Sequence, residues 1–401
     1  MTKVVILAAG WGTRMRPLTD TRPKPALKVA GKTLIEHNLD QITGLVKEVI
    51  LVVGYKKEVI KEIIGEEYKG MKIKYAVQEK PIGTGDAAQK ALPFLNNKFL
   101  IINGDDLYKR DDLEKCLQKN PCIMVKEVKD PTGFGQMICK EGEINDLIEK
   151  PEENVSNLVN IGAYHINKKF FKIDLEKSER GEYEITDYIK NYLQEKTINY
   201  HLAKSWDSVS YPWNLIESMK HIFNEYETKN QGISEKNANI TGKVIIEKGV
   251  RIKSGARVEG PVYIGEKTEI GPNCYIRPYS SIGANCKIGQ SVEIKNSIVG
   301  DNSKIAHLTY LGDSVVGKNC NIGAGTIAAN LNFNEENIKT KVKEQIMNTQ
   351  RQKLGVIIGD NVKTGINVSL MPGVMIGSNS VIHPHELVKK NIKKGTVYKN
   401  E

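Results

Sequence analysis

A glycine-rich run near the start of the chain is the first feature that could do chemistry. Residues 7–15 read Leu-Ala-Ala-Gly-Trp-Gly-Thr-Arg-Met and directly follow a short apolar run. Glycines let backbone N–H groups come close to phosphate oxygens, and Arg14 adds a charge that would stabilise a departing polyphosphate. A structural strand-to-helix turn uses the same residue types. The run is more specific because Pro17 and Pro23-Lys24-Pro25 follow it.

A histidine in the second half of the chain is the other residue that could do chemistry. Residues 304–313 read Lys-Ile-Ala-His-Leu-Thr-Tyr-Leu-Gly-Asp, so His307 interrupts a pattern of aliphatic and small residues. A single histidine more often has a structural role, but stacked coils would bring Arg277, Lys295 and Tyr310 near this one. Such groups suit an anionic amino-sugar phosphate, with the histidine as general base.

The first part of the chain must position the glycine-rich run. Over residues 1–229, short β-branched runs alternate with helical patterns, which indicates an α/β, Rossmann-like domain with a mainly parallel sheet. The expected strands are residues 4–7, 48–53, 73–77, 99–102 and 122–125. Residues 213–229 carry apolar side chains on one helical face, and the polar stretch that follows predicts a linker over residues 230–239.

A period of six residues begins after the expected linker and predicts the element that positions His307. The residues in unbroken register are Ile240, Ile246, Ile252, Val258, Ile264, Ile270, Ile276, Ile282, Ile288 and Ile294. Each step suits one short strand and one corner of a triangular solenoid, with the aliphatic side chain inside and glycine or asparagine in the turn. The register slips near Val299 and Val316, and an irregular excursion covers residues 329–354. We therefore expect residues 240–401 to form an all-β parallel β-helix.

Length and composition limit the alternatives. A chain of 401 residues exceeds the usual size of one hydrophobic core, so two domains are expected. No apolar run is as long as a membrane-spanning helix, and Arg14 and Arg16 closely follow the first apolar run, so neither a membrane protein nor an exported one is expected. The six cysteines form no CxxC pair and fit reduced thiols in the cytoplasm. The net charge of +10 suits phosphorylated substrates as well as nucleic acid, and we expect no nucleic-acid partner.

The complete run over residues 7–25 resembles the signature of the sugar-phosphate nucleotidylyltransferases, L-A-A-G-x-G-T-R-[ML]-x-P followed by P-K. The resemblance implies that a sugar-1-phosphate oxygen attacks the α-phosphorus of UTP or dTTP and releases pyrophosphate, with Mg²⁺ as cofactor. No covalent chemistry is needed from the protein, so we expect Arg14, Lys24 and Mg²⁺ to provide the catalysis. The residues that match nucleotide-binding or sugar-binding segments of the family are Leu7, Ala8, Ala9, Gly10, Gly12, Thr13, Gln78, Gly83, Thr84, Gly104, Gly135, Glu149, Lys150 and Asn160. A further matching segment covers residues 180–187.

The same resemblance implies a metal site, with one departure from the family pattern. Asp105, at the end of an expected strand, matches the aspartate that binds Mg²⁺. The other metal segment of the family reads W-x-D-[IV]-G, whereas residues 206–210 here read Trp-Asp-Ser-Val-Ser. Ser208 thus takes the aspartate position and Asp207 stands one place earlier, which turns a strand side chain to the other face unless a bulge restores it. Asp105 and Asp207 are the predicted metal ligands.

The second half of the chain resembles the acetyltransferase part of the bifunctional GlmU enzymes, which make UDP-N-acetylglucosamine, and its long excursion resembles the archaeal members. The resemblance implies a left-handed β-helix and a homotrimer with acetyl-CoA between neighbouring chains. It implies that His307 is the general base towards the amine of glucosamine-1-phosphate. The other matching residues are Arg277, Lys295 and Tyr310 for the sugar phosphate, Asn330 for the amine, and Asn321 and Ala324 for acetyl-CoA. The basic residues Lys339 and Lys353 are candidates for the CoA phosphates.

Three functions remain open on the sequence alone. The leading hypothesis is a bifunctional enzyme that acetylates glucosamine-1-phosphate and then uridylylates the product. The second is a glucose-1-phosphate thymidylyl- or uridylyltransferase with a broad-specificity amino-sugar-phosphate acetyltransferase domain. The third is an acetyltransferase or assembly subunit whose nucleotidyltransferase domain is weak or inactive, which the altered segment at Asp207 keeps open.

Overall fold

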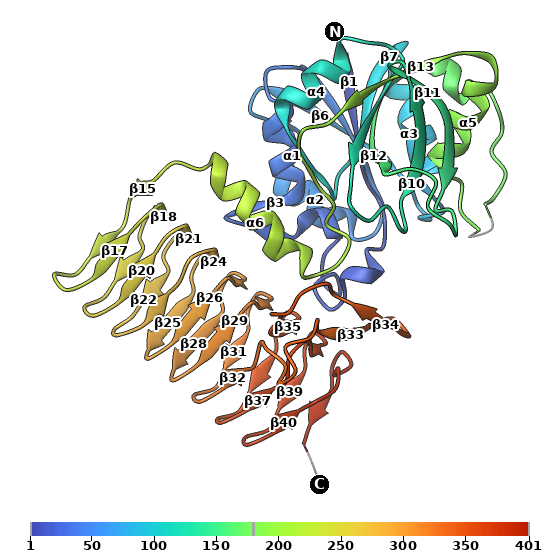
Figure 1. Ribbon diagram of the computed structural model, residues 1–401. Coiled ribbons are helices and arrows are strands. Elements are labelled where there is room, and N and C mark those ends of the chain that lie inside the picture. Colours follow the sequence, from blue (N-terminus) through green and yellow to red (C-terminus); the bar gives the residue numbers. More distant parts are fainter. Residues whose placement is uncertain (1, 179–180, 400–401) are drawn as a thin grey trace. The chain divides into compact units, whose positions relative to one another are not determined.

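The computed structural model describes residues 2–178 and 181–399, and they divide into two compact units (Figure 1). The first lies within Met1–Trp11, Pro23–Ala26 and Leu34–Ser208, and the second within Gly12–Arg22, Leu27–Thr33 and Val209–Glu401. Two short segments near the amino terminus therefore belong to the second unit. In the described part of the chain, no helix is both long enough and apolar enough to cross a lipid bilayer.

The central sheet of the first unit is covered on both faces by helices, which are α1 (Leu34–Ile42), α2 (Lys57–Ile64), α3 (Thr84–Ala91), α4 (Arg110–Leu117) and α5 (Ile185–Glu195) (Figure 1). On strand β1 (Lys3–Ala8), Val4 and Ile6 pack with α1, α2 and α4, whereas Val5 and Leu7 pack with α3 and α5. Because both faces are buried, the strand is apolar from Val4 to Ala8.

The strand order of this sheet is β10-β11-β13-β9-β12-β7-β1-β4-β6-β5. Its strands are β4 (Glu48–Val53), β5 (Glu67–Tyr68), β6 (Met71–Val77), β7 (Lys98–Asn103), β9 (Cys122–Glu127), β10 (Gly135–Lys140), β11 (Glu143–Glu149), β12 (Leu158–Asn167) and β13 (Ile198–Leu202), besides β1. Strands β7, β1, β4 and β6 are parallel, but β12 runs antiparallel to both β7 and β9. The sheet is thus mixed rather than mainly parallel. The reason is that β9 to β12 follow one another without a helix in the described segment 122–167, and parallel neighbours would need a crossover.

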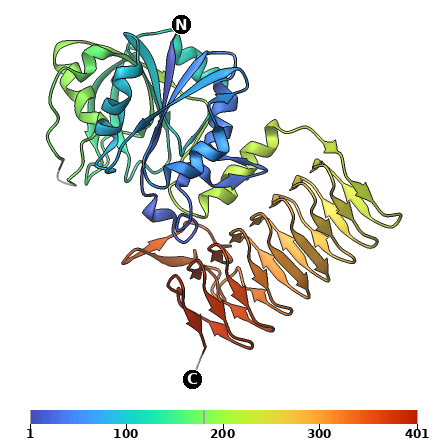
Figure 2. The same cartoon turned by 180° about the vertical axis from the view of Figure 1, so that it is seen from behind.

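The second unit is dominated by a parallel β-helix in which each coil adds one short strand to each of three sheets (Figure 2). The first sheet contains β15 (Lys229–Asn230), β18 (Val244–Ile246), β21 (Val262–Ile264), β24 (Ser280–Ile282), β27 (Ile298–Val299), β30 (Val315–Val316), β35 (Ile357–Ile358) and β38 (Met375–Ile376). The second contains β16 (Ile233–Ser234), β19 (Arg251–Ile252), β22 (Glu269–Ile270), β25 (Lys287–Gln290), β28 (Lys304–His307), β31 (Asn321–Ile322), β36 (Lys363–Thr364), β39 (Val381–Ile382) and β41 (Val397–Tyr398). The third contains β17 (Asn239–Thr241), β20 (Arg257–Glu259), β23 (Tyr275–Ile276), β26 (Glu293–Lys295), β29 (Tyr310–Gly312), β32 (Ile327–Ala328), β37 (Ser369–Leu370) and β40 (Leu387–Val388).

The six-residue period corresponds to the buried column of this β-helix. Ile252, Ile270 and Ile288 stack in successive coils of the second sheet, and each is fully buried. The predicted slips are shorter coils, because Ile282 pairs with Val299, seventeen residues on, whereas Ile264 pairs with Ile282, eighteen residues on. The six-residue period therefore indicates the length of each coil as well as the residues that form the core.

Two segments differ from the sequence-based expectation. The excursion over residues 329–354 contains an antiparallel hairpin of β33 (Lys339–Val342) and β34 (Gln345–Asn348). The segment expected as a linker, residues 230–239, contains β16 and the start of β17, which pair with the next coil. The hexapeptide pattern does not predict strands at this point, because β15 and β16 are exposed and polar at most positions. The helix before it, α6, covers only Asn214–Glu225.

Candidate active sites

The glycine-rich run follows β1 at the carboxyl edge of the sheet in the first unit. Its main chain is held from two neighbouring strand ends, since Gly104 N–H donates to Leu7 O at 2.9 Å and Tyr55 N–H donates to Ala9 O at 3.1 Å. Gly10 lies beyond these bonds, and apart from its two chain neighbours no described residue comes within 4 Å of where its Cβ would be. Open backbone at the end of parallel strands is the environment in which phosphates bind.

Lys24 and Asp105, far apart in the sequence, form an ion pair in the same unit. Lys24 Nζ lies 2.7 Å from Asp105 Oδ2, and only 9% of the lysine side chain is exposed. Asp105 follows β7, and Gly104 before it has no room for a side chain, because a Cβ would lie 2.9 Å from Leu7 O. The structure thus brings a predicted catalytic lysine and a predicted metal ligand together, next to the strand that leads into the glycine-rich run.

Asp207, the other predicted metal ligand, lies on a short strand beside the Asp105 segment. Strand β14 (Trp206–Asp207) pairs antiparallel with β8 (Leu107–Tyr108), and Asp207 stands opposite Leu107. Trp206 packs against the hydrophobic core, so Asp207 points to the other face of its strand. Within residues 2–178 and 181–399, no three His, Cys, Asp or Glu side chains gather as a metal site. Two carboxylates still fit Mg²⁺, which takes oxygen ligands and completes its shell with substrate phosphates and water.

Gln78 and the loop after it form another part of this unit's site. The Gln78 side chain is buried, and its Nε2 donates to Gly83 O at 3.0 Å and to Asp86 Oδ2 at 2.8 Å. Gly83 has a φ of +127°, and a Cβ there would overlap the backbone of Tyr183. Only glycine tolerates both conditions. The amide that is expected to read the base is therefore held by this loop.

The segment predicted over residues 180–187 docks on the same loop. Gly85 N–H donates to Tyr183 O at 2.8 Å, and Tyr183 N–H donates to Ile82 O at 2.8 Å. Thr84 Oγ1 accepts a hydrogen bond from Ile185 N–H at 3.1 Å. Arg180, the first residue of the predicted segment, lies outside the described residues. The two sequence segments thus form one substructure.

The predicted sugar-binding residues meet on β10, β11 and β12. Gly135 pairs with Glu149, and a Cβ on Gly135 would lie 2.9 Å from Glu149 Oε2 and 3.7 Å from the Asn160 Cβ. Lys150 Nζ lies 3.6 Å from Glu149 Oε1. Asn160 Nδ2 donates to the Tyr164 hydroxyl at 2.9 Å, and burial raises the pKa of Tyr164, so this hydroxyl keeps its proton. These contacts orient the polar groups that a sugar would meet.

Arg14 belongs to the second unit, together with Gly12 and Thr13. Gly12 takes the left-handed conformation at the start of a short 3-10 helix over Thr13–Met15. The Arg14 guanidinium carbon lies 5.7 Å from the centre of the Tyr211 ring. Tyr211 in turn stacks on Trp213, with ring centres 4.8 Å apart and planes inclined by 2°. Because Trp213 is buried, the arginine rests on an aromatic surface that is itself held in place.

Replacing Tyr211 with alanine should lower nucleotidyl transfer by about threefold, since a cation–π contact at an exposed site contributes less than about 1 kcal/mol. Tyr211→Phe keeps the ring and should retain wild-type activity, which makes it the matched control. Pyrophosphate release with saturating UTP and sugar phosphate is the measurement. Equal losses in both variants would show that the hydroxyl, not the ring beneath Arg14, is what matters.

Three residues predicted to bind the sugar phosphate lie on consecutive coils of the third sheet. Arg277 follows β23, Lys295 ends β26 and Tyr310 begins β29. Arg277 Nη1 lies 2.8 Å from Glu293 Oε1, and Glu293 is the ladder partner of Tyr310. Burial raises the pKa of Tyr310, with Asp313 and Glu293 adding to the effect, so the hydroxyl remains a proton donor. The coil stacking therefore produces the expected cluster.

Asp313 connects this cluster to Asn330, and sequence reasoning missed it. Its side chain is 4% exposed, and Oδ2 accepts from Asn330 Nδ2 at 2.6 Å and lies 3.4 Å from Lys295 Nζ. Its Oδ1 accepts from Asn296 Nδ2 at 2.6 Å and lies 3.7 Å from Arg351 Nη2. In the sequence Asp313 looks like an ordinary turn residue, because aspartate tolerates the positive φ of +51° that it has here. Its four partners come from three separate parts of the chain.

His307 lies at the end of β28 on the second sheet, one corner away from Tyr310. Thr309 Oγ1 donates to His307 O at 2.8 Å, and Leu308 between them has a φ of +48°, which forms the corner. The His307 side chain is exposed, and within the described residues its imidazole makes no hydrogen bond or ion pair. Lys295 and Asn330 thus share Asp313 as a partner. His307, the predicted general base, lies at an adjacent corner.

The predicted acetyl-CoA residues lie on the coils beyond His307. Asn321 pairs with Lys304 in the second sheet, and Ala324 O accepts from Asn367 N–H at 2.8 Å. Lys353 forms an isolated bridge with Leu331, at the base of the excursion. Lys339 stands opposite Asn348 in the hairpin. Lys353 is therefore close in the chain to the Arg351 that contacts Asp313, whereas Lys339 lies further along the excursion.

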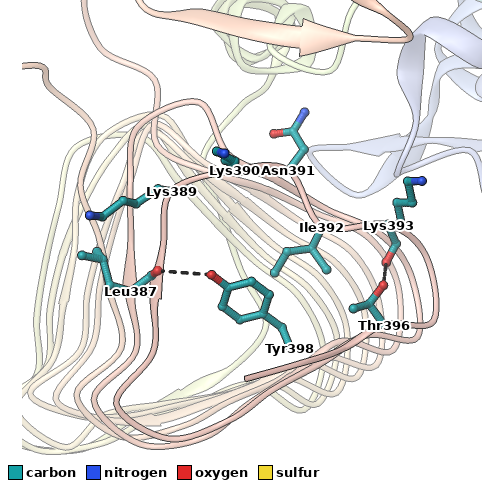
Figure 3. A pocket seen from close by; sticks show the side chains of 8 residues that line it. All are labelled: Leu387, Lys389, Lys390, Asn391, Ile392, Lys393, Thr396 and Tyr398. Carbon is teal, nitrogen blue, oxygen red and sulfur yellow. Dashed lines mark hydrogen bonds between the residues drawn. The ribbon is translucent and has the colours of Figure 1, made fainter. Parts of the chain in front are cut away.

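A pocket of about 570 Å³ opens at the last coil of the β-helix (Figure 3). Its lining residues are Leu387, Lys389, Lys390, Asn391, Ile392, Lys393, Thr396 and Tyr398. The apolar part is the open end of the solenoid core, where the Tyr398 hydroxyl donates to Leu387 O at 3.5 Å. None of the predicted site residues is among these, so the pocket is separate from the cluster at Asp313.

Fold and site together define a nucleotidyltransferase unit linked in one chain to a hexapeptide β-helix. Residues 3–225 match the family described as Nucleotidyl transferase, and residues 258–397 match the family described as GMPPB C-terminal domain. The crystal structure of a UDP-glucose pyrophosphorylase complexed with UDP-glucose superposes with a TM-score of 0.51 at 24% identity, covering 56% of this chain and all of that one. That likeness concerns the fold.

Relatives of similar length make the assignment specific. The bifunctional protein GlmU of Methanocaldococcus jannaschii is 43% identical over 403 residues, which cover 99% of this chain and 97% of that protein. The bifunctional sugar-1-phosphate nucleotidylyltransferase/acetyltransferase of Sulfurisphaera tokodaii is 40% identical over 99% of this chain and 100% of its own length. The chain belongs to the family of archaeal bifunctional GlmU proteins.

Proposed function

We propose that this chain makes UDP-N-acetylglucosamine by two transfers. The first moves an acetyl group from acetyl-CoA to glucosamine-1-phosphate, and the second moves a uridylyl group from UTP to N-acetylglucosamine-1-phosphate and releases pyrophosphate. The observation that carries the proposal is that one chain holds both clusters: the Lys24–Asp105 pair beside the glycine-rich run, and Lys295, Asn330 and Asp313 near His307. The names of the two archaeal relatives, which match along nearly their whole length, agree with it.

In the acetyl transfer, the amine nitrogen of glucosamine-1-phosphate attacks the thioester carbonyl, and the His307 imidazole accepts a proton from this amine. A carbon–nitrogen bond forms, the carbon–sulfur bond breaks, and the departing CoA thiolate takes the proton from the imidazolium. Arg277 and Lys295 hold the sugar phosphate, and Asn330 orients the amine. A backbone N–H at Ala324 stabilises the oxyanion.

In the nucleotidyl transfer, an oxygen of the sugar phosphate attacks the α-phosphorus of UTP, and the bond to the β-phosphate oxygen breaks. The open backbone around Gly10 holds the triphosphate, while Gln78 and Thr84 read the base. Lys24 and Arg14 neutralise the charge that moves onto pyrophosphate. Mg²⁺, held by Asp105 and Asp207, would supply further positive charge to the phosphate oxygens.

Assembly and location are part of the same proposal. The β-helix winds left-handed, and three chains form a homotrimer that binds acetyl-CoA between neighbours, with Lys339 and Lys353 directed at its phosphates. The hexapeptide period over residues 240–401 supports this arrangement. The enzyme works in the cytoplasm, where these substrates and reduced thiols occur together, and the buried cysteines are all unpaired.

The test is an incubation of the purified chain with glucosamine-1-phosphate, acetyl-CoA, UTP and Mg²⁺, with each component omitted in turn. UDP-N-acetylglucosamine should form only in the complete mixture, and CoA thiol should appear whether or not UTP is present. Parallel incubations with glucose-1-phosphate and dTTP test the second hypothesis. That hypothesis expects these substrates to give the faster pyrophosphate release. Thiol release without pyrophosphate release under any substrate pair would leave only the acetyltransferase.

A further inference from the structure

We propose that Asp360, in the β-helix, is a positioning residue for nucleotidyl transfer, because it anchors the chain segment that carries Arg14 and leads into Lys24. The inference rests on the proposed nucleotidyl transfer and adds a residue to it that no sequence motif indicates. All contacts that carry it lie within the second unit, which contains Gly12–Arg22 and Leu27–Thr33 as well as the β-helix.

The two carboxylate oxygens of Asp360 have different partners. Oδ1 accepts from Lys318 N–H at 2.8 Å, a bond that closes the corner between two coils. Oδ2 lies 2.5 Å from Arg22 Nη2 and also accepts a hydrogen bond from Thr21 Oγ1. Only 1% of the Asp360 side chain and 14% of the Arg22 side chain are exposed. A nearly dry, charge-assisted contact with a second hydrogen bond holds one geometry far more strictly than a surface ion pair does.

Ser378, at the same corner one coil further, holds the segment at two more points. Its Oγ donates to Pro17 O at 3.3 Å, and its N–H donates to Asp20 Oδ2 at 3.3 Å. The same Oγ accepts from Asp360 N–H at 3.0 Å, so the two corners form one hydrogen-bonded support. Residues 17–22 are therefore fixed along their length by a rigid, close-packed element.

Asp301 repeats the arrangement at a second place. Its Oδ1 accepts from Ala284 N–H at 2.9 Å, and its Oδ2 lies 2.7 Å from Lys28 Nζ. The equivalent corner in other coils carries Ala284, Lys318 or Ser378, so a hexapeptide corner does not require an acid. The Lys28–Asp301 pair is more exposed, at 44% and 24% of the side chains, and is expected to be the weaker anchor.

The positions of these anchors in the chain explain their relevance to catalysis. Lys24 lies between the anchored residues Arg22 and Lys28, and Arg14 lies three residues before Pro17. Both cations must meet the phosphates within a fraction of an ångström, and a small misplacement of a catalytic group is costly. Loss of the buried anchor should therefore lower kcat more than it weakens binding.

The decisive variant is Asp360→Asn, which keeps an acceptor for Lys318 N–H and removes the charge that faces Arg22. We expect kcat for nucleotidyl transfer to fall by about tenfold, KM for UTP to change by less than about threefold, and acetyl transfer to stay within about twofold. Asp301→Asn, the matched control on the exposed pair, should cost less than about threefold. Adding Arg22→Gln to Asp360→Asn should cause little further loss, because both changes break the same contact.

A second measurement does not depend on activity. Hydrogen exchange of peptides that cover residues 12–22 in the full-length chain should be faster in Asp360→Asn than in wild type. Unchanged exchange, unchanged nucleotidyl transfer, or an equal fall of both activities would overturn the proposal. A wild-type chain without nucleotidyl transfer would instead refute the proposed function, and the exchange result would still decide whether Asp360 anchors the segment.

Discussion

Replacing His307 with alanine is expected to lower acetyl transfer by about 10³-fold, the usual effect of removing a general base. Nucleotidyl transfer should remain within about twofold of wild type, because the two clusters share no residue. The imidazole is exposed and makes no hydrogen bond within the described residues, so its loss leaves no buried group unpaired. CoA thiol release with glucosamine-1-phosphate, and pyrophosphate release with N-acetylglucosamine-1-phosphate and UTP, measure the two activities.

His221→Ala is the matched control for this experiment. His221 is an exposed histidine on α6 in the same unit, where alanine suits the helix. It should leave both activities unchanged. Retention of more than about a tenth of the acetyl transfer in His307→Ala would argue against a general base at this position, and an equal fall of both activities would argue against two separate sites.

Replacing Lys24 with alanine should lower nucleotidyl transfer by about 10²- to 10³-fold, the effect typical of removing one preorganised group that stabilises developing charge. The lysine side chain is nearly buried beside Asp105, so no solvent cation can take its place with the same geometry. Its loss also leaves the carboxylate of Asp105 without its partner. Acetyl transfer should not change. The measurement is pyrophosphate release at saturating UTP and sugar phosphate.

Two further variants show whether the loss of nucleotidyl transfer in Lys24→Ala is specific to this lysine. Lys61→Ala removes a half-buried lysine of α2 whose ammonium lies 3.4 Å from Glu58 Oε1 and 6.0 Å from the centre of the Tyr75 ring, and it should have no effect on either activity. Lys24→Arg keeps the charge but places a planar fork where an ammonium group stood, so activity should fall between wild type and Lys24→Ala. An arginine variant as inactive as the alanine variant, together with a lowered melting temperature, would point to a structural role.

The fold was largely predictable because its signals are local. Residues 48–53, predicted as a strand, are strand β4 with the same bounds, and both faces of that strand are buried. In the β-helix every coil repeats the same short environment, so Ile270 and Ile288 occupy equivalent places and the period shows directly in the sequence. The antiparallel strand β12 was not foreseen, since strand direction depends on pairing partners far away in the chain.

The types of residue in the candidate sites were predictable from the sequence, but the contacts between their side chains were less so. The pair of Lys24 and Asp105 joins two motifs that the sequence shows separately, 81 residues apart. Asp313 and Asp360 each read as turn residues after glycine, and only the folded chain shows that one holds Asn330 and the other holds Arg22. The sequence around a corner aspartate does not show its role, because that role depends on which residues pack against it.

The sequence by itself determined the two kinds of unit, the glycine-rich run with Arg14 and Lys24, and the histidine in the hexapeptide repeat, because backbone conformation and burial impose short-range patterns. The tertiary structure alone decided which of these residues meet. It brought Lys24 to Asp105, gathered the cluster around Asp313, and placed residues 17–22 against the corners of the β-helix. The physical reason is that such contacts join groups far apart in the chain, and no local pattern records the partner of a side chain.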